Sequence, residues 1–368
     1  MQAIILKCPK FGRFHFGLMG LDENSSLYQT SDIIHSDTLF SALVSICAKT
    51  SPDDVEDLIA SFKSPKDGMK ISSAFYCLQL LQNEKELKKI FFLPKPTYLD
   101  LVNEDVLERK KVKNVRFISK TVWEKGLLPQ EWTLRNGCYI IRGGFVLHTE
   151  DLAYDLALRI ETISEIKTAP KIADHARQKR DNIFFQTDLL LGYTGLDQEE
   201  LIELGYPEAY RLEIQPHFYF LLESNLFGER QRLEKLLILL LEVLVDEGIG
   251  GAISTGCGQL VGYEILPFSF DLEEDEGETV YCTSLSLIAP QDESDLRGVR
   301  RGKVQVRGGR NTASDGRLKR IKMFTEGTVI EKQVTGSIAS LHPSKPYLRY
   351  GRSFPISMHS KYVLHDYL

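Results

Sequence analysis

A glycine-rich segment, residues 248–258, constrains the fold of this chain more than any other stretch. It follows an apolar run with helical leucine spacing at 229–247 and precedes a strand-like run at 259–266. Glycine lacks Cβ, so the segment can adopt positive φ angles and expose backbone N–H groups, which together bind anions such as phosphate. A helix C-cap and a tight turn would account for its first glycines but not for its last two. We therefore interpret it as a phosphate cradle formed by Gly248, Gly250, Gly251, Ser254, Thr255, Gly256 and Gly258.

Length, charge and cysteine usage limit the possible protein classes. The chain has 368 residues, enough for two domains, and its net charge of -6 excludes a uniformly basic protein but not local basic patches. Its six cysteines occur singly, without the paired spacing of zinc ligands, so no metal or other cofactor is expected. Free thiols and the lack of an apolar leader indicate the reducing cytoplasm. The longest apolar run, 236–241, is too short to span a bilayer, so no membrane association is expected.

The order of the predicted elements indicates an α+β fold. A strand at 2–8, a helix at 36–49 and a strand near 70–76 come first, and a strand at 212–223 and the helix at 229–247 precede the glycine segment and its following strand. This order is that of a split βαβ or ferredoxin-like (RRM-like) unit with long insertions.

An acidic run at 271–278 is the best candidate for a domain boundary. It separates a first domain, 1–268, from a smaller β-rich domain, 269–368. The first domain contains an inserted basic hairpin region at about 105–195, and residues 83–89 are expected to form a charged helix.

Two segments of the first domain combine basic and aromatic residues. Residues 10–17 interleave phenylalanines with Arg13 and His15. Aromatic rings stack on bases and basic side chains contact phosphates, so this segment suits single-stranded nucleic acid. Residues 166–188 form a basic arm, with Arg177 and Arg180, that ends in aromatic residues and suits a hairpin projecting onto a nucleic acid. The alternative for residues 10–17 is the end of a strand whose phenylalanines belong to the core. The alternative for residues 166–188 is an ordinary exposed loop.

Two further segments are basic without aromatic residues. The block at 109–116 is either a solvated surface or a phosphate contact. Residues 297–322 contain Asp315 as their only acid and are punctuated by glycines, so they are expected to be flexible until an anionic partner orders them. From this second segment we expect Arg297, Arg300 and Arg301 to contact RNA or a partner subunit.

A short polar group lies at the start of the predicted helix at 36–49. Ser36 is a suitable N-cap, and Asp37 in the first turn complements the helix dipole. His35 precedes them, where it is able to hydrogen-bond a phosphate or base or to take part in catalysis. A structural role for a single histidine beside a single aspartate is the more common outcome.

Four stretches of the sequence resemble one protein family. The glycine pattern resembles the C-terminal glycine-rich loop of the RAMP superfamily of CRISPR-associated RNA-binding proteins. Residues 34–40 (IHSDTLF), 320–327 (RIKMFTEG) and 350–352 (YGR) narrow the resemblance to the Csm subunit 4 family of type III-A effector complexes.

The resemblance implies two ferredoxin-like domains, of which the first carries the glycine loop. It also implies that the chain holds the 5′ tag of a CRISPR RNA, docks to the large polymerase-like subunit and meets the first backbone RAMP subunit. A projecting hairpin would disturb pairing between the guide and its target RNA. On this resemblance the chain is a non-catalytic RNA-binding scaffold.

Other functions remain open at this point. Related superfamily members cut RNA, so an endoribonuclease using His35 in general acid–base chemistry or a metal at Asp37 is the alternative. A protein-only scaffold would leave the glycine segment without a ligand. A nucleotide-binding enzyme is least favoured, because neither a P-loop nor a dinucleotide-binding glycine motif is present.

Overall fold

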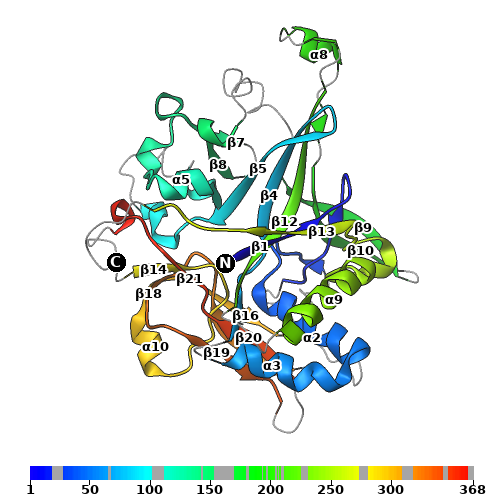
Figure 1. Ribbon diagram of the computed structural model, residues 1–368, viewed down its shortest axis with the longest axis vertical. Coiled ribbons are helices and arrows are strands. Elements are labelled where there is room, and N and C mark those ends of the chain that lie inside the picture. Colours follow the sequence, from blue (N-terminus) through cyan, green and yellow to red (C-terminus); the bar gives the residue numbers. More distant parts are fainter. Residues whose placement is uncertain are drawn as a thin grey trace.

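The computed structural model describes most of the chain. The described residues are 1–18, 28–64, 68–101, 112–141, 144–152, 170–179, 182–192, 194–195, 198–203, 205, 207–208, 211–224, 231–272, 281–308, 318–342 and 347–363. They form an α+β fold in which one large sheet, two helices beside it and a second small sheet surround a shared core (Figure 1).

The large sheet runs through the middle of the molecule. Its strand order is β13-β1-β12-β4-β5-β6-β8-β7, and neighbouring strands are antiparallel except β6 and β8. Two short strands, β3 and β11, pair with β12 outside this order. The strand bounds are β1 Gln2–Lys7, β3 Met69–Ile71, β4 Phe75–Gln82, β5 Lys85–Pro94, β6 Phe117–Ser119, β7 Cys138–Ile141, β8 Phe145–His148, β11 Thr194–Gly195, β12 Leu212–Ser224 and β13 Gly262–Pro267.

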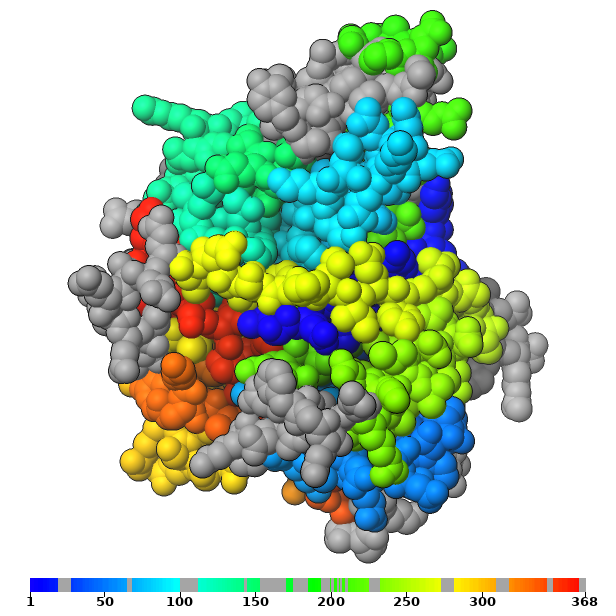
Figure 2. Space-filling view, viewed as in Figure 1, coloured from blue at the N-terminus to red at the C-terminus, as the bar shows by residue number. Residues whose placement is uncertain are grey.

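The first strand lies second from one edge of this sheet, between β12 and β13. Its residues Ala3, Ile4, Ile5 and Leu6 are all buried, so both faces of the strand are covered and a continuous apolar run is required there. Figure 2 shows the segment through β13 crossing one face of the molecule directly beside the N-terminal strand.

Two helices pack on one another and on this end of the sheet. Helix α2, Ser36–Thr50, buries Leu39, Leu43 and Ile46, and helix α9, Gln231–Glu247, buries Leu237, Leu240 and Leu244. The spacing of three to four residues places each set on one helical face. Other short helices among the described residues include α3 Val55–Lys63, α5 Lys120–Glu124, α8 Gln198–Glu203 and the 3₁₀ turns Pro52–Asp54, Thr97–Leu101, Pro129–Glu131, Leu134–Asn136, Thr149–Asp151, Ile253–Thr255 and Ser360–Tyr362.

The C-terminal part contains a four-stranded antiparallel sheet, β15-β18-β14-β21, and two separate hairpins, β16-β17 and β19-β20. The bounds are β14 Tyr281–Ser284, α10 Glu293–Gly298, β15 Val299–Arg301, β16 Val304–Arg307, β17 Ile321–Phe324, β18 Val329–Glu331, β19 Gly336–Ser340, β20 Leu348–Arg352 and β21 Pro355–Ser357. The expected boundary run falls largely on residues 273–280, outside the described residues.

The two parts of the chain share one hydrophobic core. The rings of Phe40, Phe62 and Tyr350 pack against each other with centroids 5.2 to 5.8 Å apart. The same buried cluster includes Leu285 and Phe354 from the C-terminal part. Burying these apolar side chains therefore stabilises both parts together.

The basic arm is a β-hairpin of strands β9, Lys171–Lys179, and β10, Asn182–Leu190. Its second strand pairs at its far end with a two-residue strand, β2 Arg13–Phe14. The base of the hairpin is therefore joined to the segment that follows β1.

Two predictions of local structure are wrong. The expected charged helix at 83–89 is part of the hairpin β4-β5, whose turn places Asn83 and Glu84 at φ angles of 48° and 67°. Pairing with β12 and burial of Leu80 and Ile90 outweigh the helical preference of the charged residues. The expected flexible segment at 297–322 contains the end of α10, the strands β15 and β16 and the start of β17, and its residues 309–317 lie outside the described residues.

Candidate nucleic-acid interface

The glycine segment forms a loop that closes on itself directly after α9. Gly248, Gly250, Gly256 and Gly258 have φ angles between 77° and 100°, and Ala252 is also left-handed at 59°. A Cβ on Gly248 would lie 2.6 Å from the carbonyl oxygen of Gly258, and a Cβ on Gly258 would overlap Ile249. Glycine is required at these two positions because the two ends of the loop touch through their backbones.

The same loop is hydrogen-bonded to the segment around β2. The amide of Gly251 donates to the carbonyl of His15, and the amide of Gly258 donates to the carbonyl of Arg13, each at 2.8 Å. The amides of Gly248 and Gly256 donate to carbonyls of α9 and of the loop itself. These four N–H groups are therefore not available to an external phosphate.

The tip of the loop has a different character. Residues 253–256 are exposed, and a Cβ on Gly256 would meet no atom within 4 Å. The amides of Ala252, Ile253 and Ser254 donate no hydrogen bond to any other residue that the structure describes. The Thr255 hydroxyl donates to the carbonyl of Ala252 at 2.7 Å and so holds the turn. The tip thus presents backbone donors to the outside.

A polar cluster joins the loop to β2 and to the hairpin. Arg13 donates through Nη2 to the carbonyl of Thr255 at 2.8 Å, and its Nε lies 3.2 Å from a carboxylate oxygen of Asp188 in β10. The Nδ1 of His15 lies 2.9 Å from the carbonyl of Thr187 and 3.3 Å from Asp188. The structure therefore brings Arg13 and His15 to the glycine loop, although His15 is only 5 % exposed.

The group at the start of α2 lies inside the molecule. His35 is the N-cap of α2, one residue before the predicted cap Ser36. Its Nδ1 lies 2.9 Å from Oε1 of Glu326, and its Nε2 lies 3.1 Å from Oγ of Ser31. Ser36 accepts from the amide of Leu287 at 3.2 Å, so it fastens the helix start to the C-terminal part and does not cap its own helix.

Asp37 is fully buried and ion-paired with two arginines. Arg307 donates to it from Nε at 2.9 Å and from Nη2 at 2.7 Å, and Arg349 donates to it as well. Burial by itself would raise the pKa of the Asp37 carboxyl, but the two guanidinium groups outweigh burial and hold the pKa well below its ordinary value of 3.8. The carboxylate is therefore charged and fully engaged at neutral pH.

Three of the four stretches that carry the family resemblance meet at this junction. Residues 34–40 contact residues 320–327 through His35 and Glu326, and they contact residues 350–352 through Phe40 and Tyr350. No group of three histidine, cysteine or acidic side chains suited to a metal ion occurs among the described residues.

The other predicted basic contacts lie apart from the loop. Arg297 is exposed on α10 and pairs with Glu293 at 2.7 Å, and Arg300 on β15 pairs with Glu331. Arg301 is exposed on the same strand. Figure 1 shows α10 on the opposite side of the view from α9 and its loop. Arg177 lies on β9, and Arg180 falls outside the described residues.

One cleft combines basic residues that sequence reasoning did not bring together. It has a volume of about 450 Å³ and lies between the segment before α2, the strand β6 and the strand β16. Its basic side chains are Lys95, Lys113, Arg116 and Lys303. Lys113 and Arg116 come from the basic block at 109–116 and Lys303 comes from the basic segment at 297–322, whereas Lys95 lies outside both.

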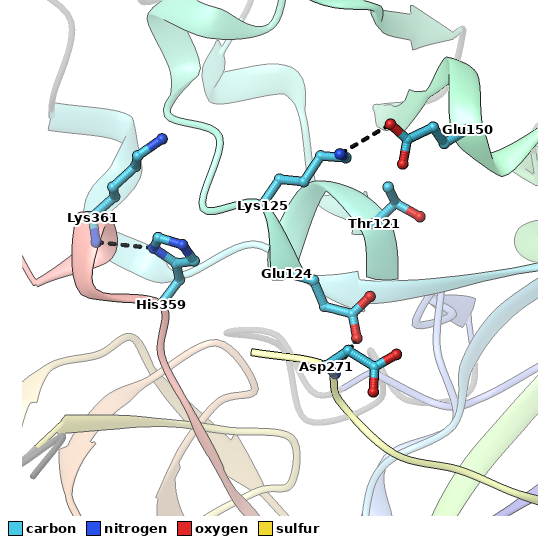
Figure 3. A pocket seen from close by; sticks show the side chains of 7 residues that line it. All are labelled: Thr121, Glu124, Lys125, Glu150, Asp271, His359 and Lys361. Atoms are coloured by element: carbon cyan, nitrogen blue, oxygen red, sulfur yellow. Dashed lines mark hydrogen bonds and ion pairs between the residues drawn. The ribbon is translucent and has the colours of Figure 1, made fainter. Parts of the chain in front are cut away.

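A second pocket, of about 430 Å³, lies between α5 and the C-terminal segment (Figure 3). It mixes charges: Lys125 pairs with Glu150 at 3.0 Å, and Glu124 accepts from the amide of Asp271 at 2.6 Å. The acidic groups at this pocket make it a poor match for a phosphate.

None of the described helices is both long and apolar enough to cross a membrane.

Comparisons with known proteins agree on one family. No protein-family model matches the chain. A curated protein of Methanocaldococcus jannaschii described as CRISPR system Cms protein Csm4 is 24% identical over 364 residues, which cover 93% of this chain and 89% of that protein.

Solved structures share the fold. A chain of the Csm3-Csm4 subcomplex in the type III-A CRISPR-Cas interference complex superposes with a TM-score of 0.64 at 19% identity, covering 98% of this chain and 100% of that chain. A chain of the Csm1-Csm4 cassette in complex with pppApA superposes with a TM-score of 0.53 at 16% identity, covering 98% of both. The predicted resemblance is thus confirmed: over nearly its whole length this chain is similar to Csm4 proteins of type III-A CRISPR Csm complexes.

Proposed function

We propose that this chain holds the 5′ tag of a CRISPR RNA as a non-catalytic scaffold. The observation that carries the proposal is the exposed tip of the glycine loop, whose free amides lie beside Arg13 at the base of a basic hairpin. Backbone donors and a guanidinium together suit phosphates of a single strand. Ser254 and Thr255 at the tip add polar side chains.

The architecture is best interpreted as two ferredoxin-like units. In the first, the strands β1, β4, β12 and β13 and the helices α2 and α9 follow one another as βαββαβ, and the sheet order is β13-β1-β12-β4. The second unit has the order β21-β14-β18-β15, which repeats the same pattern with the hairpin β19-β20 in place of a second helix. On this interpretation the glycine loop joins the last helix and the last strand of the first unit.

The partners follow from the family. The solved relatives are a Csm3-Csm4 subcomplex and Csm1-Csm4 cassettes. We assign to this chain the same two contacts, with a backbone RAMP subunit and with the large polymerase-like subunit, in the cytoplasm. We assign Arg297, Arg300 and Arg301, which lie on α10 and β15 apart from the loop, to a protein partner and not to the tag.

Ser254→Glu tests the loop, because it puts a negative charge on the exposed tip without touching the packed glycines. We expect tagged CRISPR RNA to bind about 10-fold more weakly at low salt, because the carboxylate repels a phosphate of the RNA. Loss of one phosphate contact should also lower the salt slope of the single-stranded complex by about 0.7. Ser294→Glu, the same change on the exposed face of α10, is the matched control. Equal affinities of the two variants in fluorescence anisotropy would reject the role of the loop.

One observation favours the endoribonuclease alternative. Ser31, His35 and Glu326 form a hydrogen-bonded series, with 3.1 Å from Oγ to Nε2 and 2.9 Å from Nδ1 to Oε1, which is the order of groups that activates a hydroxyl. Against it, Asp37 is paired with two arginines. Cleavage of RNA by the purified chain, lost in His35→Asn with unchanged RNA binding, would replace the scaffold proposal with the enzymatic one.

A further inference from the structure

Asp188, in the hairpin strand β10, is a buried carboxylate at the point where the hairpin, the segment around β2 and the glycine loop meet. It is 1 % exposed, and its neighbours come from all three segments. Removing a carboxylate from water is unfavourable unless charged or hydrogen-bonding groups surround it. Binding of RNA at the loop tip does not by itself require a buried acid at this place, so the position of Asp188 needs a separate explanation.

The two carboxylate oxygens of Asp188 have different partners. Oδ1 accepts from Nε2 of Gln186 at 3.0 Å and lies 3.3 Å from Nδ1 of His15. Oδ2 lies 3.2 Å from Nε of Arg13 and accepts from the thiol of Cys257 at 3.6 Å. The carboxylate is therefore held in one orientation, with one oxygen facing the guanidinium of Arg13.

Arg13 carries this orientation to the surface. Its side chain is 39 % exposed, although its Nε faces the buried Asp188. Its Nη2 donates to the carbonyl of Thr255 at 2.8 Å, and its guanidinium also contacts the sulfur of Cys257. A guanidinium has five N–H donors in one plane, so fixing two of its nitrogens fixes the direction of the other donors. The remaining donors of Arg13 thus have a defined direction beside the loop tip.

The backbone joins the same three segments but does not orient this side chain. Arg13 pairs with Leu190 in the register of β2 and β10, and its carbonyl accepts from the amide of Gly258 at 2.8 Å. These main-chain bonds fix the position of the Arg13 backbone, whereas a long arginine side chain keeps many rotamers unless side-chain contacts restrict it. Asp188 is the charged group that restricts it here.

The charge of Asp188 opposes RNA binding unless it serves to orient Arg13. A carboxylate near a phosphate site makes the local potential more negative, so electrostatics alone favours a neutral side chain at residue 188. A buried ion pair is also a weak source of stability, because desolvation offsets much of the attraction. Orientation is what an acidic partner supplies well, since ion pairs between arginine and a carboxylate are directional.

We propose that Asp188 is a positioning residue, which holds the Arg13 guanidinium so that its outward donors meet a phosphate of the RNA at the loop tip. This inference deepens the proposed RNA-holding function and rests on it. Asp188 does not contact the RNA itself, because it is buried. Its effect on RNA affinity therefore depends on Arg13.

Asp188→Asn tests the proposal, because orientation and charge predict opposite changes in affinity. The substitution removes one negative charge and keeps the size of the side chain. Charge alone predicts tighter binding of tagged CRISPR RNA, whereas loss of positioning predicts binding that is about 5-fold weaker. Asp54→Asn, which removes an acidic partner of Arg232 at the opposite end of α9, is the matched control. Fluorescence anisotropy measures the affinities, and thermal melting verifies that both variants are folded.

A double-mutant cycle with Arg13→Gln distinguishes positioning from a general structural role. Arg13→Gln should weaken binding about 10-fold, and adding Asp188→Asn should weaken it no further, because the group that Asp188 orients is gone. Losses that add independently would show that Asp188 acts through the fold and would overturn the proposal. Affinity of Asp188→Asn equal to or above that of the wild type would overturn it as well.

A measurement on the wild-type chain decides the question if Asp188→Asn does not fold. NMR of the protein labelled with ¹⁵N-arginine reports the Nε–H of Arg13, which is identified as the signal that is missing in Arg13→Gln. We expect this Nε–H to exchange slowly with water in the free protein and with tagged RNA bound, because Asp188 holds it in both states. Rapid exchange in either state would overturn the proposal.

The outcomes separate this inference from the function on which it rests. If tagged RNA binds and Arg13→Gln weakens it but Asp188→Asn does not, the positioning role is overturned and the loop proposal stands. If tagged RNA does not bind the wild-type chain, the loop proposal is overturned and the positioning role with it.

Discussion

The glycine loop and the junction at the start of α2 are both rich in motif residues, but the fold uses them in opposite ways. At the loop, the glycines pack against β2 and leave a tip, residues 253–256, exposed. At the junction, His35, Ser36 and Asp37 are buried at 5 % exposure or less and bind residues of the C-terminal part.

The comparison shows that motif residues can form contacts within the chain as readily as contacts with a ligand. His35 and Asp37 contact Glu326 and Arg307, which lie about 270 to 290 residues away in the sequence. Their side chains fix the start of α2 to the C-terminal part of the chain. In the loop, by contrast, the amides of residues 252–254 have no acceptor within the described part of the chain, so they are available to a ligand.

The largest effect is expected at Asp37. Asp37→Asn removes the charge that neutralises Arg307 and Arg349, and uncompensated buried charge costs about 3–5 kcal/mol. Urea unfolding measures the loss. Arg297→Ala, which removes an exposed pair on α10, should change stability by less than ~1 kcal/mol. A loss of the same size in both variants would contradict the structural role of the junction.

Acid should unfold the protein through the same junction. Burial opposes ionisation of Asp37 and Glu326, but the arginines and His35 outweigh it and lower both pKa values below the ordinary 3.8 and 4.5. A lowered folded-state pKa gives stability that is complete above the ordinary value and is lost as pH falls toward the folded value. Unfolding free energy should therefore fall below about pH 4.5. The fall should be shallower in Asp37→Asn, and an unchanged slope would argue against this origin.

Within the loop, two glycines with the same φ of 81° should differ. A Cβ at Gly258 overlaps Ile249, whereas a Cβ at Gly256 meets nothing within 4 Å. Gly256→Ala should lower the free energy of unfolding by about 1–2 kcal/mol, because alanine must adopt a left-handed conformation there. Gly258→Ala should lower it further, because the loop must also open to accommodate the Cβ. Chemical denaturation of both variants measures the difference, and equal costs would show that the loop does not close tightly on itself.

The smallest effect is expected at Arg13. Arg13→Lys keeps the charge beside the loop but loses the planar donor set that reaches Thr255 and Asp188. We expect a decrease of a few-fold in affinity for tagged RNA, about 0.5–1 kcal/mol, with little change in salt slope. Arg297→Lys is the control. If Arg13→Lys binds as the wild type does, Arg13 contributes charge alone.

Much of the fold was predictable from local patterns. The strand at 2–8, the helices at 36–49 and 229–247 and the strand at 212–223 agree with the structure to within about two residues, because their apolar residues repeat at the period of the element. The helix predicted at 83–89 failed because charged residues with helical preference lie on an exposed hairpin whose partner strand is more than 100 residues away.

The site was predictable only in part. Arg13 and His15 were expected near RNA, and the structure places them at the glycine loop. The cleft was not predicted, because Lys95, Lys113 and Lys303 come from separate segments and nothing in the sequence shows that these segments meet.

The sequence by itself determined that a helix must end in a backbone turn of positive φ at residues 248–258, and it carried the motifs of the family. Only the tertiary structure decided which glycine amides face the protein and which face outward, and that Asp37 is a buried ion-pair partner. The physical reason is that φ preference and apolar periodicity are local, whereas burial and charge pairing depend on residues that folding brings together from distant parts of the chain.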